Sequence, residues 1–177
     1  MSIQIGAKPD SGFDNPLGML QDCHRRIERF LHVLCVVAVQ ASGRSLNPEE
    51  SSAVTAALHY FQEGGRHHNA DEEESLFPRL RAAQPDDAQA NLAHLEADHR
   101  RTEQLHHLVE NLYRMWIDSA TLSSSDQQAL LSATSELQRI YTEHIRLEEL
   151  TVFPRAAQLL DKTAIAAIGS EFQARRK

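Results

Sequence analysis

The sequence predicts an all-α fold, an antiparallel up-down four-helix bundle with a short C-terminal helix. Apolar residues recur at helical three- and four-residue spacing through four long segments, and no alternating β pattern with hairpin turns separates them. The segments are joined by short connections, which favour antiparallel neighbours. At 177 residues, the chain has the length of one domain with a substantial core.

The first two helices begin with the same signal, an asparagine cap followed by proline. Asn15 opens the first helix, which we expect to run to about residue 42, before a glycine. Asn47 opens the second, which we expect to end near Phe77-Pro78. Gly64-Gly65 lies inside this second helix and predicts a local kink, because glycine lowers helix propensity.

The third helix follows Pro85 and its two aspartates and should end at about Ser119. The fourth follows the serine run 123–125 and should stop near Phe153-Pro154, and a short helix should follow Asp161. The predicted organisation is a flexible N-terminus over residues 1–14, the bundle over 15–160 and a C-terminal helix or tail over 161–177. We expect the basic residues at its end, 175–177, to be solvated.

Composition excludes several classes of protein. A hydrophobic content of 41% and a charged content of 24% are ordinary for a soluble domain, and the net charge of −7 argues against nucleic-acid binding. The longest apolar run, residues 33–39, is too short to span a bilayer, and no secretory signal is visible at the N-terminus. Cys23 and Cys35 lie in one helical pattern, so a disulfide between them is not expected. We therefore expect a cytoplasmic protein.

The unusual feature is histidine, at ten residues. In each long helix the inward apolar stripe is interrupted by one histidine at a similar depth: His24, His68, His99 and His144. Buried histidines and carboxylates without partners are expensive and are normally paired or bound to metal. Core histidines that only hydrogen-bond glutamates, in a bundle without metal, are the alternative. Four in register favour metal.

Two of these histidines are each followed four residues later by glutamate, as His68-x3-Glu72 and His144-x3-Glu148. Residues four apart share one helix face, so both side chains of a pair can reach one centre. The two motifs are related by a shift of 76 positions (144 − 68), and His24 and His99 by a shift of 75 (99 − 24). Two helix pairs related by a pseudo-two-fold axis would bring four histidines and two glutamates into one dinuclear site.

Nitrogen and carboxylate ligands without thiolate exclude iron–sulfur clusters and cysteine-type structural zinc. Six such ligands suit two iron ions, each holding two histidines, with both ions bridged by Glu72 and Glu148. With an oxo or hydroxo bridge each iron is about five-coordinate, which leaves a position open for a small ligand. Residue types alone also allow zinc or manganese, which we consider less favoured than iron.

The sequence resembles the hemerythrin-like, or HHE cation-binding, family. The resemblance covers about residues 15–160 and rests on the four histidines, the two His-x3-Glu motifs and their EESLFP and EELTVFP continuations. It implies a four-helix bundle with a non-haem di-iron centre that handles O2, NO, peroxide or iron.

Two departures from the family pattern bear on function. Oxygen-carrying hemerythrins use five histidines and an aspartate on the last helix, whereas here Glu103 stands where a fifth histidine would be and the last carboxylate is Glu148. The ligand set is more similar to the di-iron proteins that repair iron–sulfur clusters. Those carry an extra N-terminal cysteine-bearing domain, and only 14 residues precede Asn15. We therefore expect a stand-alone bundle.

Three further residues are candidates for proton handling: Glu28, Glu103 and Tyr141. The two glutamates lie one turn beyond the single-histidine ligands, and Tyr141 lies one turn before His144. His106 reads as a hydrogen-bonded core residue or pocket liner, while the acids beside Glu72 should face water or support the ligands. The function that follows is binding or sensing of O2, NO or peroxide, and the alternatives are enzymatic turnover of the same molecules and iron handling or repair. No protein partner can be read.

Overall fold

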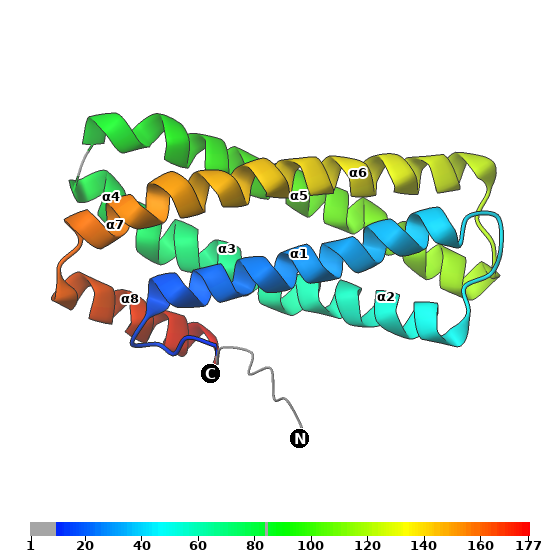
Figure 1. Cartoon of the computed structure of the whole chain (residues 1–177), viewed down its shortest axis with the longest axis horizontal. Coiled ribbons are helices and arrows are strands. Elements are labelled where there is room, and N and C mark those ends of the chain that lie inside the picture. Colours follow the sequence, from blue (N-terminus) through cyan, green and yellow to red (C-terminus); the bar gives the residue numbers. More distant parts are fainter. Residues whose placement is uncertain (1–9, 84) are drawn as a thin grey trace, which may run out of the picture.

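The computed structural model describes residues 10–83 and 85–177, without the side chains of residues 85–88, and this part contains helices and no strand (Figure 1). The elements are α1 (Pro16–Gln40), α2 (Pro48–Tyr60), η1 (Phe61–Gly65), α3 (Arg66–Asp71), η2 (Glu72–Leu76), α4 (Phe77–Ala83), α5 (Pro85–Ser119), α6 (Ser124–Leu147), η3 (Glu148–Val152), α7 (Phe153–Leu159) and α8 (Lys162–Arg175). Each η element is a single π-helical turn. The predicted all-α class is confirmed. Residues 1–9 of the segment expected to be flexible lie outside the described residues.

Four helical columns lie side by side: α1, the run from α2 to α4, α5, and the run from α6 to α7 (Figure 1). α1 packs against α2 and α6, and α5 packs against α4 and α6. The chain reverses direction through residues 41–47 and again through residues 120–123, so consecutive columns are antiparallel. The predicted up-down bundle is therefore confirmed, and α8 is the additional C-terminal helix.

The second and fourth columns continue past the positions where the sequence predicted their ends. The second runs through Phe77-Pro78 to Ala83. A π-helical turn precedes the proline, and the Phe77 N–H bonds to the carbonyl of Glu72, five residues back. Proline at the start of a helix needs no N–H donor, so an α-helix can begin directly after this wider turn. The fourth column repeats the arrangement at Phe153-Pro154.

Local sequence accounts for the helix starts and for the third π-helical turn. The Asn15 side chain accepts a hydrogen bond from the Gly18 N–H, and Asn47 forms a reciprocal capping box with Glu50. Gly64-Gly65 falls within η1, so the column widens there and remains helical. The low helix propensity of the glycine pair therefore produces a local π turn.

The buried apolar residues form two clusters. One fills the half of the bundle near the 41–47 and 120–123 loops and includes Leu34, Tyr113 and Leu137. The other lies beneath α8 and includes Leu20 and Phe77. In each column the predicted metal ligands lie between the two apolar clusters. A layer of polar side chains therefore separates the clusters.

The C-terminal helix and the segment before α1 close one side of the bundle. Asp161 caps α8 by accepting the Ala164 N–H. The Ser11 N–H donates a hydrogen bond to the Asp22 carboxylate at 2.6 Å. The Phe13 carbonyl lies against α8 at Gly169, so close that a Cβ added to this glycine would lie 1.9 Å from the carbonyl oxygen. Within the described residues, no helix has the length and apolar character needed to cross a membrane.

Candidate metal centre

The polar layer brings together one histidine from each column: His24 on α1, His68 on α3, His99 on α5 and His144 on α6. All four are at most 5% exposed. The two glutamates of the His-x3-Glu motifs, at 0% exposure, open the turns η2 and η3. π-Helical turns are rare and occur often at functional sites, and here two of the three, η2 and η3, begin at a predicted ligand.

The first ligand group comprises His24, His68, Glu72 and Glu148, whose candidate donor atoms all lie within 4.8 Å of one another. His24 Nε2 lies 3.0 Å from Glu148 Oε2, and His68 Nε2 lies 3.6 Å from Glu72 Oε1. Both imidazoles therefore present Nε2 toward the carboxylates.

The second group comprises His99, His144 and the same two glutamates, with donor atoms again within 4.8 Å. His99 Nε2 lies 3.3 Å from Glu72 Oε2, and His144 Nε2 lies 3.3 Å from Glu148 Oε2. The two Nε2 atoms are 3.2 Å apart. The two groups share both carboxylates, so a cation at either group would use Glu72 and Glu148.

The hydrogen bonding of the two glutamates supports a cation at this place. Among the described residues, all four carboxylate oxygens of Glu72 and Glu148 are buried without a hydrogen-bond partner, and so is His24 Nε2. Buried charges are normally paired or coordinate a metal, because desolvation otherwise penalises them heavily. A metal ion bound between these oxygens and the histidine nitrogens would satisfy them, so the residues present fit a metal centre.

The protonation of the site reflects the same electrostatics. Burial raises the pKa of Glu72 to about 7, and the charge of Glu148 acts in the same direction. Burial lowers the pKa of His144, but the charges of Glu148 and Glu72 and the hydrogen bonds to Asp98 and Glu148 together outweigh this effect and raise the pKa to about 10. Imidazolium can therefore balance the carboxylates in the metal-free protein, and metal binding has to displace its proton.

Outer carboxylates orient three of the four imidazoles through Nδ1. His24 donates to Glu149 at 2.9 Å, and His99 donates to Glu73 at 2.7 Å. The third pair joins His144 to Asp98 at 3.3 Å. Each bond fixes the tautomer in which Nε2 carries the lone pair for a metal.

The sequence indicated only part of this outer layer. Glu73 and Glu149 directly follow the ligand glutamates at matching positions, so their role could be read from the repeat. Asp98 gave no such signal, because its counterpart in the first half of the repeat is Cys23. The π-helical turns were also missed, since the helical periodicity continues through them.

Asp71 and the C-terminal arginines contradict two expectations. Asp71 was expected to face water or support the ligands, yet it is 1% exposed and accepts from Arg175 at 2.9 Å and Arg176 at 2.5 Å. The prediction of a solvated basic end was therefore wrong for both arginines. Their guanidinium groups bind a buried carboxylate, which fastens α8 to α3 beside Glu72.

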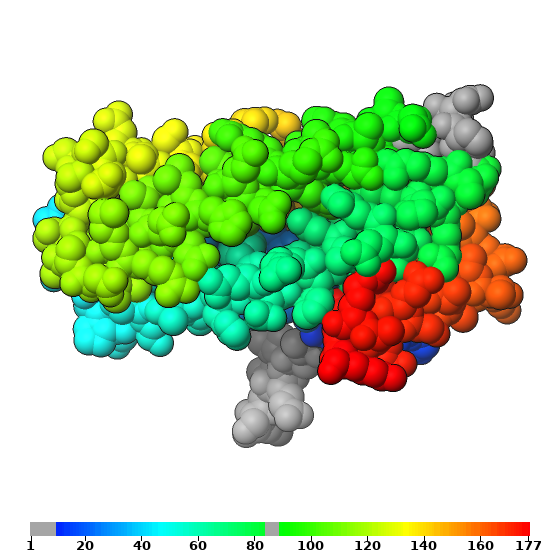
Figure 2. Space-filling model, turned by 180° about the vertical axis from the view of Figure 1, so that it is seen from behind, coloured from blue at the N-terminus to red at the C-terminus, as the bar shows by residue number. Residues whose placement is uncertain are grey.

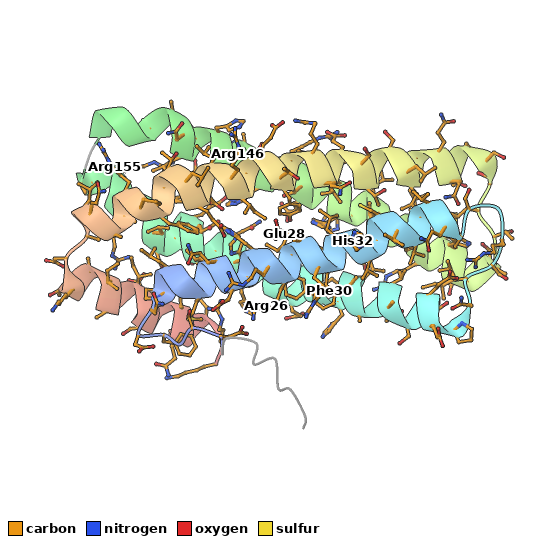
Figure 3. All side chains as sticks on the ribbon, in the orientation of Figure 1. Arg26, Glu28, Phe30, His32, Arg146 and Arg155 are labelled. Carbon is orange, nitrogen blue, oxygen red and sulfur yellow. The ribbon has the colours of Figure 1, made fainter. Side chains whose placement is uncertain are left out.

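The candidate proton-handling residues are dispersed. The side chain of Glu28 is exposed on α1 (Figure 3), and that of Glu103 is exposed on α5. Tyr141 is buried, and its hydroxyl lies 3.0 Å from His106 Nε2. His106 also stacks on Phe61 at 4.1 Å between ring centroids, in line with the expectation of a hydrogen-bonded pocket liner.

A cleft of about 600 Å³ reaches the centre between α5 and the run from α2 to α3. Its buried lining residues include His99, Thr102 and Tyr141. Figure 2 shows this face of the molecule, hollowed between α5 and α3. The cleft is lined by charged side chains as well: Glu63, Arg66, Glu73, Arg100, Glu103 and Glu110.

Comparison with known proteins gives one family. Residues 15–156 match the family model described as the hemerythrin HHE cation binding domain. The matched segment contains all six residues of the two ligand groups. None of the curated proteins compared with the chain gives a significant match.

Proposed function

Because the chain belongs to the hemerythrin HHE cation-binding domain family, we propose that its buried centre holds two iron ions and binds or senses a small ligand, namely O2, NO or peroxide. The coarser conclusion, a metal-binding protein of hemerythrin type, follows from the family and the two ligand groups. The imidazole and carboxylate donors suit iron but also allow zinc or manganese, so our preference for iron rests on the family.

One observation carries the proposal. The two four-residue ligand groups overlap in Glu72 and Glu148, whose buried oxygens have no other partner among the described residues. Because both groups use the same two carboxylates, the arrangement suits a pair of ions held close together better than two separate mononuclear sites. The His24/His68 position and the His99/His144 position would each supply two nitrogens.

The chain's own residues would prepare the site for a small ligand. The two ions, when bound, would supply redox chemistry and open coordination positions. Glu149, Glu73 and Asp98 hold three imidazoles with Nε2 inward. The two apolar clusters exclude water above and below the layer, and the cleft beside His99 gives a small molecule a route from solvent.

Metal analysis of the purified protein tests the proposal. We expect about two irons per chain by plasma mass spectrometry, together with near-ultraviolet absorption from a bridged iron pair. His68→Ala should lose at least one of the two ions, whereas His59→Ala, which changes an exposed histidine on α2, should retain both. Full iron content in His68→Ala, or no metal after anaerobic addition of Fe2+ to the wild type, would contradict the proposal.

A second candidate is enzymatic turnover of peroxide, O2 or NO. The hydrogen-bonded Tyr141–His106 pair favours it, because both residues line the cleft that contains His99 and could deliver protons there. In this case Tyr141→Phe should lower the rate of peroxide consumption while leaving iron content unchanged. A simple binder would show saturable ligand binding and no sustained consumption.

The two cysteines bear on the cellular compartment. Cys23 and Cys35 are free thiols, which agrees with the expectation that they do not form a disulfide. We propose a cytoplasmic location on this ground, since unpaired thiols are typical of a reducing compartment. Immunoblotting of separated cell fractions would test it.

A further inference from the structure

We infer that the two metal positions are not equivalent, and that the His99/His144 position holds its ion more tightly than the His24/His68 position. The inference rests on the proposed two-ion centre and concerns the outer nitrogens of the four imidazoles. It names Asp98 as a positioning residue that creates the difference.

The outer contacts differ between the two positions. At the His99/His144 position both Nδ1 atoms have a carboxylate, Glu73 at 2.7 Å and Asp98 at 3.3 Å. At the other position only His24 has one, Glu149 at 2.9 Å.

His68 is the exception. It is 2% exposed, and within the described part of the chain its Nδ1 is buried without a hydrogen-bond partner. Its Nε2 faces Glu72 at 3.6 Å, so Nδ1 is the nitrogen that faces away from the metal group. An unpartnered buried N–H carries a desolvation penalty, and nothing holds this ring in the tautomer that a metal requires.

The internal repeat identifies what is missing. Asp98 directly precedes His99, and a shift of 75 positions (98 − 75 = 23) relates it to Cys23, which directly precedes His24. The same pseudo-two-fold relation pairs His144 with His68. It therefore pairs the Asp98 carboxylate, which contacts His144, with the Cys23 thiol. The Cys23 Sγ lies 3.3 Å from Arg26 Nη2. The second half of the chain thus has an acid where the first half has a cysteine.

The consequence is a difference in affinity. Loss of an outer carboxylate behind a metal-binding histidine typically lowers metal affinity about 10- to 100-fold. Since the bridging glutamates are common to both positions, they do not favour one over the other. The first ion should therefore occupy the His99/His144 position, and the His24/His68 position should fill second and release its ion first.

Anaerobic titration of the metal-free protein with Fe2+, followed by calorimetry and native mass spectrometry, tests the inference. The wild type should bind two ions in two steps. Asp98→Asn, which keeps the shape and removes the charge, should weaken the tighter step about 10- to 100-fold. His68→Ala should retain the tighter step and lose the weaker one.

Cys23 offers a gain-of-function arm with a matched control. Cys23→Asp should raise the Fe2+ affinity of the weaker binding step about 10- to 100-fold by placing a carboxylate behind His68. Cys23→Asn, which introduces a side chain of the same shape as aspartate without the charge, should not. Asp98→Asn remains decisive if Cys23→Asp does not fold.

The outcomes separate this inference from the proposed function. Two ions bound with equal affinity in the wild type, or an Asp98→Asn variant with an unchanged tighter step, would overturn the non-equivalence and leave the two-ion centre intact. An equal effect of Cys23→Asp and Cys23→Asn would also count against it. A wild type that binds no Fe2+ would overturn the proposed function itself.

Discussion

Glu72 and Glu148 occupy equivalent places in the two halves of the bundle: each opens a π-helical turn, and each belongs to both ligand groups. Each follows a ligand histidine by four residues and precedes a Phe-Pro pair. In each, both oxygens are buried without a hydrogen-bond partner among the described residues. We therefore expect both carboxylates to stabilise the metal-bound protein, and Glu72, whose pKa burial raises to about 7, to destabilise the metal-free one.

Substitution of a shared carboxylate should separate these two effects. Glu72→Gln should reduce iron from two per chain to at most one, because both positions use this side chain. The metal-free variant should be as stable as the wild type or more stable by about 1–3 kcal/mol, since the substitution removes a buried charge. Metal analysis and denaturant unfolding of metal-free protein measure the two quantities.

The control for this variant is Glu143→Gln, which changes an exposed carboxylate that pairs with Arg139 at the surface. It should change the unfolding free energy of the metal-free protein by less than about 0.5 kcal/mol and leave the iron content unchanged. A metal-free Glu72→Gln protein much less stable than the wild type would show that this carboxylate serves the fold rather than a metal.

The ion pairs between α8 and Asp71 should contribute strongly to stability. Substituting both Arg175 and Arg176 by glutamine leaves a carboxylate of 1% exposure without its cations, which should cost about 3–5 kcal/mol of unfolding free energy. Adding Asp71→Asn to the double variant should recover much of this loss, because the buried charge is then gone. Denaturant unfolding of all variants measures the effect.

Lys177→Gln is the matched control, since it removes a neighbouring exposed charge. It should change stability by less than about 0.5 kcal/mol. A double arginine variant as stable as this control would mean that α8 is held by its apolar face alone, through residues such as Ile168 and Phe172.

Periodicity and spacing were enough to predict the bundle and to select the six residues that the structure brings together. The His-x3-Glu motifs carry this information locally, because positions four apart share a helix face. Glu73 and Glu149 could be noticed because both repeat directly after a ligand glutamate. Asp98 could not, because its counterpart in the repeat is Cys23. Which histidine each acid contacts depends on how the columns pack.

The misread features have a common physical origin. The second column was expected to end near Phe77-Pro78 because proline usually stops a helix, but a π-helical turn before Pro78 removes that conflict. The C-terminal arginines looked solvated because their partner Asp71 is about 100 positions away, as the separation of 104 from Arg175 shows. Short sequence windows describe neither a change of helical pitch nor a contact of that range.

Two glycines should respond to alanine with opposite signs. Gly169→Ala places a Cβ 1.9 Å from the Phe13 carbonyl oxygen, so the segment before α1 must move, at a cost of about 1–3 kcal/mol. At Gly65 the nearest neighbour of an added Cβ is a Phe61 ring carbon at 3.6 Å, an ordinary contact. Gly65→Ala should therefore be neutral or stabilising by up to about 1 kcal/mol.

Thermal and denaturant unfolding compare these two glycine variants with the wild type. The Gly169→Ala loss should largely disappear when residues 1–14 are also removed, because the clash partner Phe13 is then absent. An equal loss with and without that segment would place the cost within α8 itself.

His106 should make stability depend on pH in the acidic range. Burial, aided by the charge of His107, lowers the pKa of His106 to about 4 from an ordinary value of 6.5. The unfolded chain therefore binds a proton between these two values that the folded chain does not, and stability falls as pH drops from about 6.5 to about 4. Neutral His106 is also the form that can accept a hydrogen bond from the Tyr141 hydroxyl, which lies 3.0 Å from His106 Nε2.

His106→Asn should remove this dependence. The unfolding free energy of metal-free wild type relative to the variant should decline by up to about 3 kcal/mol between pH 7 and pH 4. His59→Asn, at an exposed position, should follow the wild type over the same range. If His106→Asn loses stability as steeply as the wild type, then the acid sensitivity belongs to another buried group such as His68, whose pKa burial also lowers, and not to His106.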